Sequence, residues 1–387
     1  MPKKQSAYAR AGVDYTKIES FKEMMIGVAR RTASFSSRRG VEVNTSVLHA
    51  HGGVYRFVRS TPHLWCLVIE GLGNKNWLAE WMRQFAGTGK TYYDLAAFDT
   101  VMMAVNDCIA QGALPVVYVD EVAAGDSEWF EDVARAHDFA EGMYRACREA
   151  GMALVAGESP ALRYLINARK PVKSAPSLSG AVVGVIAPME RLIDGSKLQA
   201  GDIIIGIASS GIHANGVSLA LKLTCKQSII GRLLESLFQK EPRLLDKLPS
   251  GRMVGEELLA PTRCYVDAIE GLLEEGVDIH ALLPGTGGGV GKLAFDKRPY
   301  TYRVHSWPEV PEIFHYLRER GVSLRGCLTT FNWGVGYYAF VPQPEVERTL
   351  AILDRKGYHA LEIGRVEEGK RCTIFEPEGI TLPPPGV

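Results

Sequence analysis

The stretch that decides the fold is GDIIIGIASSGIHANGVSLALKL, residues 201–223. Its apolar, β-branched beginning at 203–207 predicts a buried strand, and the leucine spacing of 217–223 predicts a helix. Residues 209–216 therefore form a glycine-punctuated turn between a strand and a helix N-terminus. Such a turn presents free backbone N–H groups and the positive end of a helix dipole, which suits a bound phosphate. An ordinary strand-to-helix turn with Asn215 or Ser218 as the helix cap explains the same residues equally well.

The length and composition of the whole chain limit the class of protein to which it can belong. The chain has 387 residues, is 46% hydrophobic and 23% charged, and has a formal net charge of zero. These values predict about two globular domains and give no indication of a nucleic-acid or membrane partner. The sequence contains no apolar run long enough to span a bilayer, no signal peptide, and seven cysteines without CxxC spacing. We therefore expect a cytoplasmic protein with reduced thiols.

Four carboxylates stand out in the N-terminal half. Glu70, Asp120 and Glu158 each lie at or just beyond the end of a predicted strand, and Asp107 lies near the end of the helix predicted for 98–111. A carboxylate among apolar neighbours is costly to bury unless it is paired or bound to a metal. If the strand ends cluster, the four side chains form a cation site for a Mg²⁺–nucleotide complex. A solvent-facing aspartate and simple loops are the structural alternatives.

Two glycine-containing segments could approach a ligand closely. The sequence EGLGNK at 70–75 places Gly71, Gly73 and Lys75 directly after a strand, where they could serve a phosphate. TGGG at 286–289 precedes a predicted helix and allows close approach of a ligand or of another backbone. Short Gly-x-Gly matches are common, however, and plain turns explain both segments as well.

Strands and helices alternate in both halves of the chain, which predicts an α/β (α+β) protein. The run 161–176 has basic residues and prolines without periodicity, so we place a domain boundary there, between domains 1–174 and 175–387. LTTFNWGVGYYAFV at 328–341 predicts a strand that glycines interrupt at a bulge or a close backbone contact. The common P-loop, dinucleotide and kinase motifs are absent from the sequence, and His and Cys never pair at zinc-ligand spacing.

Six segments together resemble one family, the phosphoribosylformylglycinamidine cyclo-ligases, also called aminoimidazole ribonucleotide synthetases. In the family's order and at about its spacing, the chain carries YARAGVD (8–14), AVNDCIAQGALPVVYVD (104–120), LIDGSKLQAGDIIIGIASSGIHANGVSL (192–219), ELLAPTRCYV (257–266), TGGG (286–289) and TFNWGVG (330–336). The resemblance covers nearly the whole chain. It implies a two-domain fold shared with thiamine monophosphate kinase, selenophosphate synthetase and a hydrogenase maturation factor. It also implies a homodimer in which the two N-terminal sheets pair into an interface barrel, where ATP binds.

The reaction that this resemblance implies is the ATP-dependent closure of formylglycinamidine ribonucleotide to aminoimidazole ribonucleotide. ATP phosphorylates the amide oxygen to an iminophosphate, a neighbouring nitrogen displaces the phosphate, and ADP and phosphate leave. The implied ATP-side residues are Gly71, Gly73, Lys75, Asn106, Asp107 and Gly157, with Glu70, Asp107, Asp120 and Glu158 for Mg²⁺. The implied residues for the small ribonucleotide substrate are Ser209, Ser210, Gly211, Asn332 and Gly334, with His213 and Asn215 in catalysis. Our hypothesis is that His213 positions or protonates the reacting amide, while Ser210 and Gly211 hold the ribose phosphate.

The chain departs from the family pattern on the ATP side. The family's SGTDGVGTK reads LVIEGLGNK at 67–75, so that Glu70 replaces an aspartate and apolar residues replace Ser-Gly-Thr. The family's GGETAEMPG reads AGESPALRY at 156–164, where Gly157 and Glu158 are kept. Three interpretations stay open. The favoured one is a divergent cyclo-ligase with a remodelled nucleotide site. The others are a catalytically weak ribonucleotide-binding relative and another ATP-dependent phosphoryl-transfer enzyme of the same superfamily.

Overall fold

The computed structural model describes residues 14–48, 52–225 and 243–386, so YARAGVD lies outside the described residues except for Asp14. The chain forms two compact units, Met1–Leu192 and Ile193–Val387. The boundary expected from the sequence was 174/175. The boundary lies later because the strand at 177–186 pairs within the sheet of the first unit.

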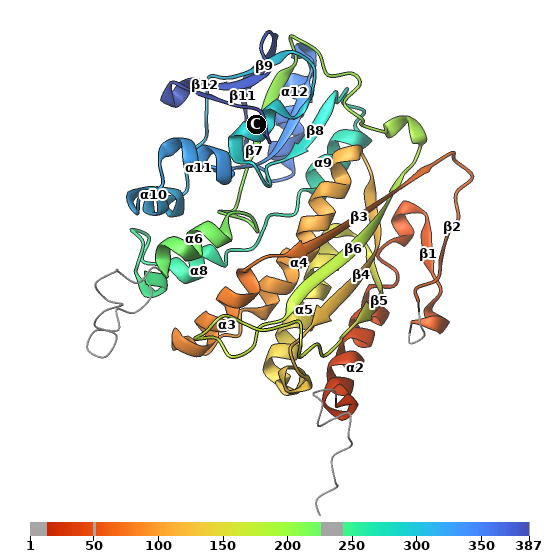
Figure 1. Ribbon diagram of the computed structural model, residues 1–387. Coiled ribbons are helices and arrows are strands. Elements are labelled where there is room, and N and C mark those ends of the chain that lie inside the picture. The colour runs from red at the N-terminus through yellow and green to blue at the C-terminus, as the bar shows by residue number, and fades with distance from the viewer. Residues whose placement is uncertain (1–13, 49–51, 226–242, 387) are drawn as a thin grey trace, which may run out of the picture. The chain divides into compact units, whose positions relative to one another are not determined.

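The first unit is built on a four-stranded mixed sheet (Figure 1). Its order is β3-β6-β4-β5, and its strands are β3 (Leu64–Leu72), β4 (Leu114–Ala123), β5 (Ala153–Glu158) and β6 (Ser177–Ile186). β6 runs antiparallel to both β3 and β4, whereas β4 and β5 are parallel. All four strands were predicted from their β-branched runs, and all four are confirmed.

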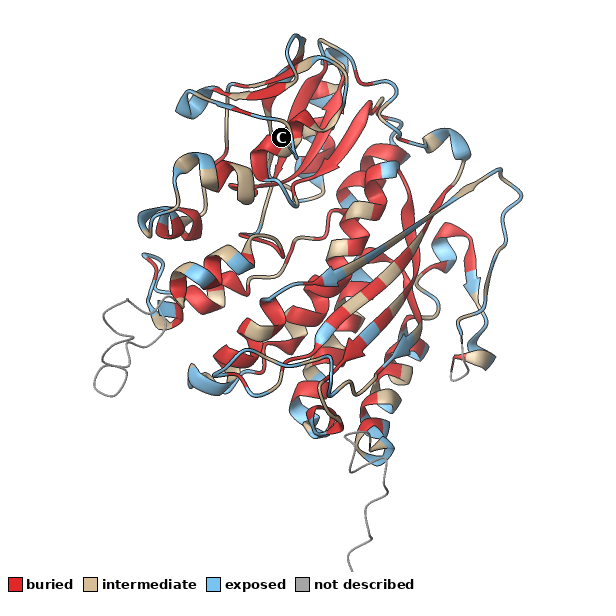
Figure 2. Ribbon diagram, in the orientation of Figure 1, coloured by how far each residue is buried: buried red, intermediate tan, exposed pale blue. Residues whose placement is uncertain are grey.

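Helices cover one face of this sheet. α4 (Tyr93–Cys108) packs against β3 and β6, α5 (Val133–Ala150) packs against α4, and α2 (Tyr15–Thr32) packs against α5. α3 (Lys75–Phe85) also contacts α4. Figure 2 shows α4 to be almost entirely buried, which matches its apolar sequence. The helix expected over 98–111 therefore begins earlier and ends in a 3-10 turn at Ile109–Gln111.

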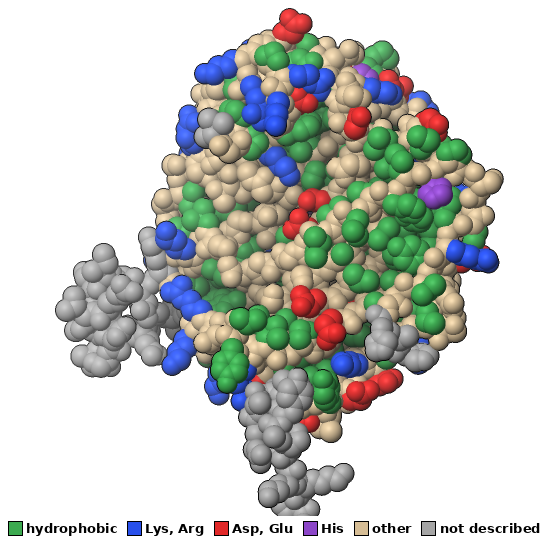
Figure 3. All heavy atoms as spheres, turned by 45° about the vertical axis from the view of Figure 1, so that its right-hand side comes forward, with side chains coloured by type: hydrophobic (Ala, Val, Ile, Leu, Met, Phe, Trp, Pro, Cys, Tyr) green, Lys and Arg blue, Asp and Glu red, His purple; other side chains and the backbone are tan. Residues whose placement is uncertain are grey.

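The other face of the sheet exposes apolar side chains along β3. Burial alternates along this strand, so that Trp65, Leu67 and Ile69 point away from the helices. Leu67 and Ile69 are each 72% exposed, and Trp65 is 45% exposed. Figure 3, which brings the right-hand side of Figure 1 forward, shows hydrophobic side chains gathered there. We call Trp65, Leu67 and Ile69 the outer strip. One chain contributes an open sheet, and closure of a barrel across two chains remains a prediction.

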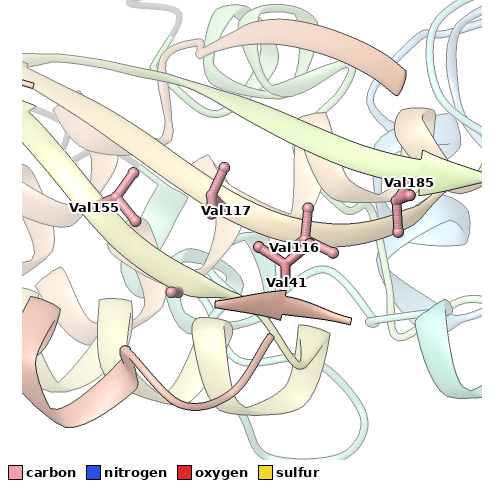
Figure 4. Packing of buried hydrophobic residues seen from close by; sticks show 6 residues of the cluster. Val41, Val116, Val117, Val155 and Val185 are labelled. Carbon is pink, nitrogen blue, oxygen red and sulfur yellow. The ribbon is translucent and has the colours of Figure 1, made fainter. Parts of the chain in front are cut away.

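A two-stranded ribbon packs on the sheet beside this strip. It consists of β1 (Val41–Val43) and β2 (Tyr55–Phe57), which pair antiparallel. Val41 joins a buried cluster with valines of β4, β5 and β6, as Figure 4 shows. The rings of Tyr55 and Phe57 lie 6.3 and 6.0 Å from that of Trp65. The ribbon therefore contacts Trp65 and leaves the more exposed Leu67 and Ile69 without apolar cover.

The second unit is built on a seven-stranded sheet of order β13-β12-β9-β11-β7-β10-β8. Its strands are β7 (Ile203–Ala208), β8 (Ala281–Pro284), β9 (Tyr300–Val304), β10 (Val335–Val341), β11 (Ala360–Glu368), β12 (Cys372–Phe375) and β13 (Ile380–Leu382). Every residue of β10 is buried. β10 runs antiparallel between β7 and β8, which places the ends of β7 and β8 at the same edge as the beginning of β10.

The helices of this unit are α6 (Val217–Thr224), α8 (Val254–Leu258), α9 (Val266–Glu274), α10 (Glu312–Glu319), α11 (Leu324–Thr330) and α12 (Val346–Arg355). The expected strand over 328–341 is corrected here, because its first residues complete α11. Ser323 caps that helix by accepting a hydrogen bond from Gly326 N. Among the described residues, no helix has both the length and the apolar character needed to cross a membrane.

Gly216, and not Asn215, occupies the N-cap position of α6. Its φ of 80° is left-handed, and a Cβ atom there would overlap the ring of Phe331. Glycine is therefore required by both the conformation and the space. The turn at 209–216 is consequently tied to the segment that precedes β10.

Candidate active site

Three loops meet at one edge of the seven-stranded sheet. They are residues 209–216 after β7, 285–288 after β8, and 331–334 before β10, and together we call them the loop cluster. Backbone bonds join them, from Ser209 N to Gly334 O (2.9 Å) and from Gly285 N to Gly336 O (2.9 Å). The strand register thus brings the turn after β7 beside residues 331–334, which lie more than a hundred residues later in the sequence.

Asn332 holds two of these loops together. It is 4% exposed, and its Oδ1 accepts hydrogen bonds from Ser209 Oγ (3.2 Å) and from Gly334 N (2.9 Å). Its Nδ2 donates to Gly211 O at 2.8 Å. Because both ends of the amide bond to the chain itself, Asn332 is placed to position the loops.

His213 shapes the turn from inside. It is 1% exposed and has a φ of 59°, an uncommon value for a residue with a side chain. Its Nε2 accepts a hydrogen bond from Ser210 N at 3.3 Å, which assigns a neutral ring with the proton on Nδ1. A Cβ on Gly336 would overlap both the His213 ring and the Tyr265 hydroxyl, so the strand approaches these side chains closely.

The surface of the loop cluster presents a different set of residues. Ser210 is exposed, while Ser209 and Asn215 are half-buried. Ser210 Oγ donates to Pro261 O at 2.6 Å, which ties the turn to the segment after α8. Gly211 has a φ of 137° and is buried. Ligand access is thus greatest at Ser209, Ser210 and Asn215.

Two buried residues of the segment 257–266 support this turn, and the sequence analysis assigned neither of them a role. Glu257 is 3% exposed, pairs with Arg252 at 2.5 Å, and lies under Gly211. Tyr265 donates from its hydroxyl to Ala208 O at 2.9 Å, and burial raises its pKa well above the usual range. The signal that could have found them is their place in ELLAPTRCYV, one of the segments shared with the family.

Lys292 supplies a positive charge at the glycine-rich loop, and no pattern in the sequence singles it out. Its ammonium donates to Pro284 O (3.1 Å) and to Thr286 O (2.7 Å). These bonds hold the start of TGGG against the end of β8. An anion approaching this loop would therefore meet a fixed cation.

In the first unit, the strand register places Glu70 and Asp120 in one row. Both residues are opposite Gly180 of β6, and Gly157 of β5 continues the row beside Asp120. Residues in one row point to the same face, so the two carboxylates share the helix-covered face, about 10 Å apart at the backbone. A Cβ on Gly157 would overlap Asp120 Oδ1, which explains the glycine.

Asp120 is a buried carboxylate with a strongly raised pKa. It is 7% exposed, and its Oδ1 is buried without a hydrogen-bond partner. Burial raises the pKa of Asp120 to about 7, against a small opposing effect of a backbone hydrogen bond. A buried, unsatisfied carboxylate oxygen is the kind of group that a cation or a donor satisfies.

The four predicted carboxylates do not come together in one chain. Glu158 lies within β5 opposite Glu121, one residue further along the strands than Asp120, and therefore faces the opposite side of the sheet. Asp107 lies at the end of α4, half-buried. Within residues 14–48, 52–225 and 243–386, no group of three or more His, Cys, Asp or Glu side chains is placed to hold a metal ion.

The remaining predicted nucleotide residues surround β3 and α4. Gly71 and Gly73 are exposed, whereas Asn106 is 2% exposed within α4. Lys75 begins α3, and its side chain is fully buried with Nζ 2.6 Å from Asp99 Oδ2. The lysine that was expected to meet a phosphate from a loop thus pairs with an aspartate inside the protein.

The chain was compared with known proteins. Family models described as AIR synthase related protein match residues 81–186 (N-terminal domain) and 199–376 (C-terminal domain). A phosphoribosylformylglycinamidine cyclo-ligase of Pyrococcus horikoshii is 35% identical over 97% of this chain and 99% of its own length.

Two solved structures share the fold at low identity. A thiamine-monophosphate kinase of Stenotrophomonas maltophilia has a TM-score of 0.55 at 14% identity, covering 91% of this chain and 96% of its own. A hydrogenase maturation protein HypE in complex with ATP has a TM-score of 0.52 at 18% identity, covering 85% of this chain and 86% of its own. These likenesses confirm the two-domain fold expected from the sequence.

Proposed function

The chain belongs to the phosphoribosylformylglycinamidine cyclo-ligase family, and from that premise we propose how its two units divide the reaction. The protein is an ATP-dependent ligase of purine biosynthesis that closes formylglycinamidine ribonucleotide to aminoimidazole ribonucleotide. The observation that carries our assignment of the ribonucleotide to the second unit is the loop cluster. There, two segments shared with the family are bonded to each other through Asn332, and the backbone bond from Gly285 N to Gly336 O brings the glycine-rich loop beside them.

The loop cluster holds the ribose phosphate of the substrate in this proposal. Ser210 is exposed at the turn that leads into α6, where helix N–H groups and the positive end of the helix dipole favour an anion. Lys292 adds a fixed positive charge from the neighbouring loop. Ser209, Gly211 and Gly334 supply the backbone beside the phosphate in this proposal.

Ring closure requires the substrate amide and its attacking nitrogen to be held in line. An amide oxygen leaves poorly until ATP phosphorylates it, after which the nitrogen displaces phosphate. The protein's contribution is orientation and exclusion of water. His213 and Asn332 act as positioning residues, because their polar atoms bond to the loops. Asn215, half-buried in the same turn, is the side chain that we assign to direct contact with the reacting amide.

ATP binds to the first unit in this proposal, beside β3 and the end of α4. Gly71, Gly73 and Gly157 allow the nucleotide to approach the backbone, and Asn106 and Asp107 border it. The buried pair of Lys75 with Asp99 joins the beginning of α3 to α4.

The fit of Mg²⁺ depends on Asp120 and Glu70. Mg²⁺ keeps several waters and binds through one or two carboxylates together with substrate phosphates, so three protein ligands are not required. The unsatisfied Oδ1 of Asp120 fits this role, and Glu70 lies in the same row. When bound, the ion would neutralise charge on the transferring phosphoryl group.

A second copy of the chain covers the outer strip in this proposal, which makes the protein a homodimer. Exposed apolar patches of this kind mark interaction sites. Leu67 and Ile69 are each 72% exposed on the sheet face that the resemblance assigns to the interface barrel. None of the seven cysteines is in a disulfide in the described residues, which supports a reducing compartment such as the cytoplasm.

One observation supports a second candidate function, a ribonucleotide-binding relative with weak catalysis. The Lys75 side chain has no exposed surface, so it cannot meet a phosphate without leaving Asp99. In that case the loop cluster would still bind the ribonucleotide, while ATP turnover would be slow.

An assay of ADP release separates these functions. Purified protein is mixed with Mg²⁺-ATP and formylglycinamidine ribonucleotide, and the product is identified by mass spectrometry. ADP release together with aminoimidazole ribonucleotide supports the cyclo-ligase. Calorimetric binding of the ribonucleotide without ADP release supports the binding relative. ADP release without the ring-closed product indicates a different acceptor.

A further inference from the structure

Two cysteines of the first unit lie side by side between β3 and the end of α4. Cys66 of β3 is the register partner of Gly184 in β6. A Cβ on Gly184 would overlap the sulfur of Cys108, the last residue of α4. The Cys108 sulfur therefore occupies the place of the missing Gly184 side chain. Cross-strand neighbours of this kind have Cβ atoms about 5 Å apart, which brings the two thiols within reach of each other.

The same corner of the fold holds both sulfurs. Cys66 Sγ lies 3.8 Å from Gln111 Oε1, and Cys108 Sγ lies 3.9 Å from Ala113 O. Gln111 and Ala113 belong to the turn that ends α4. Cys66 faces the helix side of the sheet, away from the outer strip. A partner chain bound to the outer strip would therefore not cover the Cys66 side chain.

The two thiols differ in access. Cys66 is half-buried, whereas Cys108 has no exposed surface. Hydrogen bonding to Cys108 lowers the pKa of Cys66 to about 7. A thiolate with solvent access is the form of cysteine that reacts with oxidants. By contrast, burial raises the pKa of Cys147 and of Cys327.

We propose that Cys66 and Cys108 form a peroxide-reactive dithiol that closes reversibly to a disulfide between β3 and α4. The Cys66 thiolate attacks one oxygen of hydrogen peroxide, the O–O bond breaks, and the second oxygen leaves as water after taking a proton. Cys66 becomes a sulfenic acid. The Cys108 sulfur then attacks the Cys66 sulfur, the S–O bond breaks, and the hydroxide leaves with the Cys108 proton as a second water. Two electrons pass from the sulfurs to the peroxide, and a dithiol reductant reverses the change.

The cross-link would act on the ATP side of the protein. It fixes β3, which leads into Glu70 and Lys75, to the residue that follows Asn106 and Asp107. Oxidation is therefore expected to slow ATP turnover, a consequence that rests on the proposed function. Formation of the disulfide itself does not depend on that function, so the two can fail separately.

Peptide mapping tests the disulfide directly. The reduced full-length protein is treated with hydrogen peroxide, digested without reductant and examined by mass spectrometry. We expect one dominant cross-linked pair, carrying Cys66 and Cys108, that disappears after dithiothreitol. Cys66→Ser abolishes it, while the matched control Cys225→Ser, which alters another half-buried cysteine outside any disulfide, leaves it unchanged. Sulfinic acid on Cys66 with Cys108 still free, or a Cys66 oxidation rate no higher than that of Cys225, would overturn the proposal.

A second measurement avoids any variant that fails to fold. The alkylation rate of Cys66 in the unaltered protein is followed against pH, and its midpoint is expected near 7. A midpoint at the ordinary value for cysteine would overturn the proposal. If the disulfide forms but ADP release is unchanged, the dithiol stands and its effect on turnover is refuted.

Discussion

Removal of the Asn332 side chain is expected to affect the loop cluster more than any other single substitution that we consider. Asn332→Ala deletes three hydrogen bonds, two accepted by Oδ1 and one donated by Nδ2. Each such bond contributes about 1 kcal/mol net, and a buried backbone group left unsatisfied costs more. The residue is 4% exposed, so water cannot readily replace these partners. We expect the free energy of unfolding to fall by about 3 kcal/mol.

The kinetic consequence separates positioning from general stability. If Asn332 holds the loops in register for the ribonucleotide, the variant that still folds should show a raised KM for that substrate and an unchanged KM for ATP. Ser209→Ala is the matched control, because it removes one of the three bonds, at a cost of about 1 kcal/mol. Denaturant unfolding measures the stability, and initial rates measure the two KM values.

Two results would refute this reasoning. Asn332→Ala could unfold within about 1 kcal/mol of the parent, which would mean that the three bonds contribute little net free energy. Alternatively, both KM values could change equally, which would mean that the substitution acts on the whole protein. A change confined to ribonucleotide binding is what the geometry predicts.

Three further predictions concern the first unit. Lys75→Met removes the cation that pairs with the buried Asp99 and should lower the free energy of unfolding by about 3–5 kcal/mol. The double variant Lys75→Met with Asp99→Leu should recover most of this loss. Equal losses for the single and the double variant in thermal unfolding would contradict the buried pair. The pKa of Asp120 is about 7 in the folded protein and near 4 in the unfolded chain. Without nucleotide, the free energy of unfolding should therefore decrease by up to about 4 kcal/mol as pH rises from about 4 to about 7. Asp120→Asn should remove this slope, and a variant with the same pH profile as the parent would contradict the burial of Asp120. Leu67→Asp places a charge on the outer strip and should convert a dimer to a monomer in light scattering, whereas a persistent dimer would assign the interface elsewhere.

Local patterns in the sequence were sufficient to predict most strands, because β-branched runs such as 203–207 are buried on both faces. The expected strand over 328–341 failed in its first part, where residues 328–330 complete α11, the short helix that Ser323 caps. Tertiary pairing also overrode the expected domain boundary, since β6 completes the first sheet. This pairing is not visible in a short window of sequence.

In the candidate site, too, local sequence predicted some features, whereas tertiary pairing determined others. The turn at 209–216 and the segment with Asn332 were both identified, and the structure bonds them together. The side of the sheet to which Glu158 points depends on its register with β4, and no pattern in the sequence encodes this register. The burial of Lys75 depends on Asp99, whose role only the packing of α3 on α4 reveals.

The central claim, that ATP activates the substrate amide for ring closure, is tested most directly by an isotope. Formylglycinamidine ribonucleotide carrying a heavy oxygen isotope in its amide is turned over with Mg²⁺-ATP, and the released inorganic phosphate is examined by mass spectrometry. The account predicts that the heavy oxygen appears in the phosphate in the same amount as aminoimidazole ribonucleotide is formed. Aminoimidazole ribonucleotide formed with unlabelled phosphate, the heavy oxygen having passed to water, would contradict it.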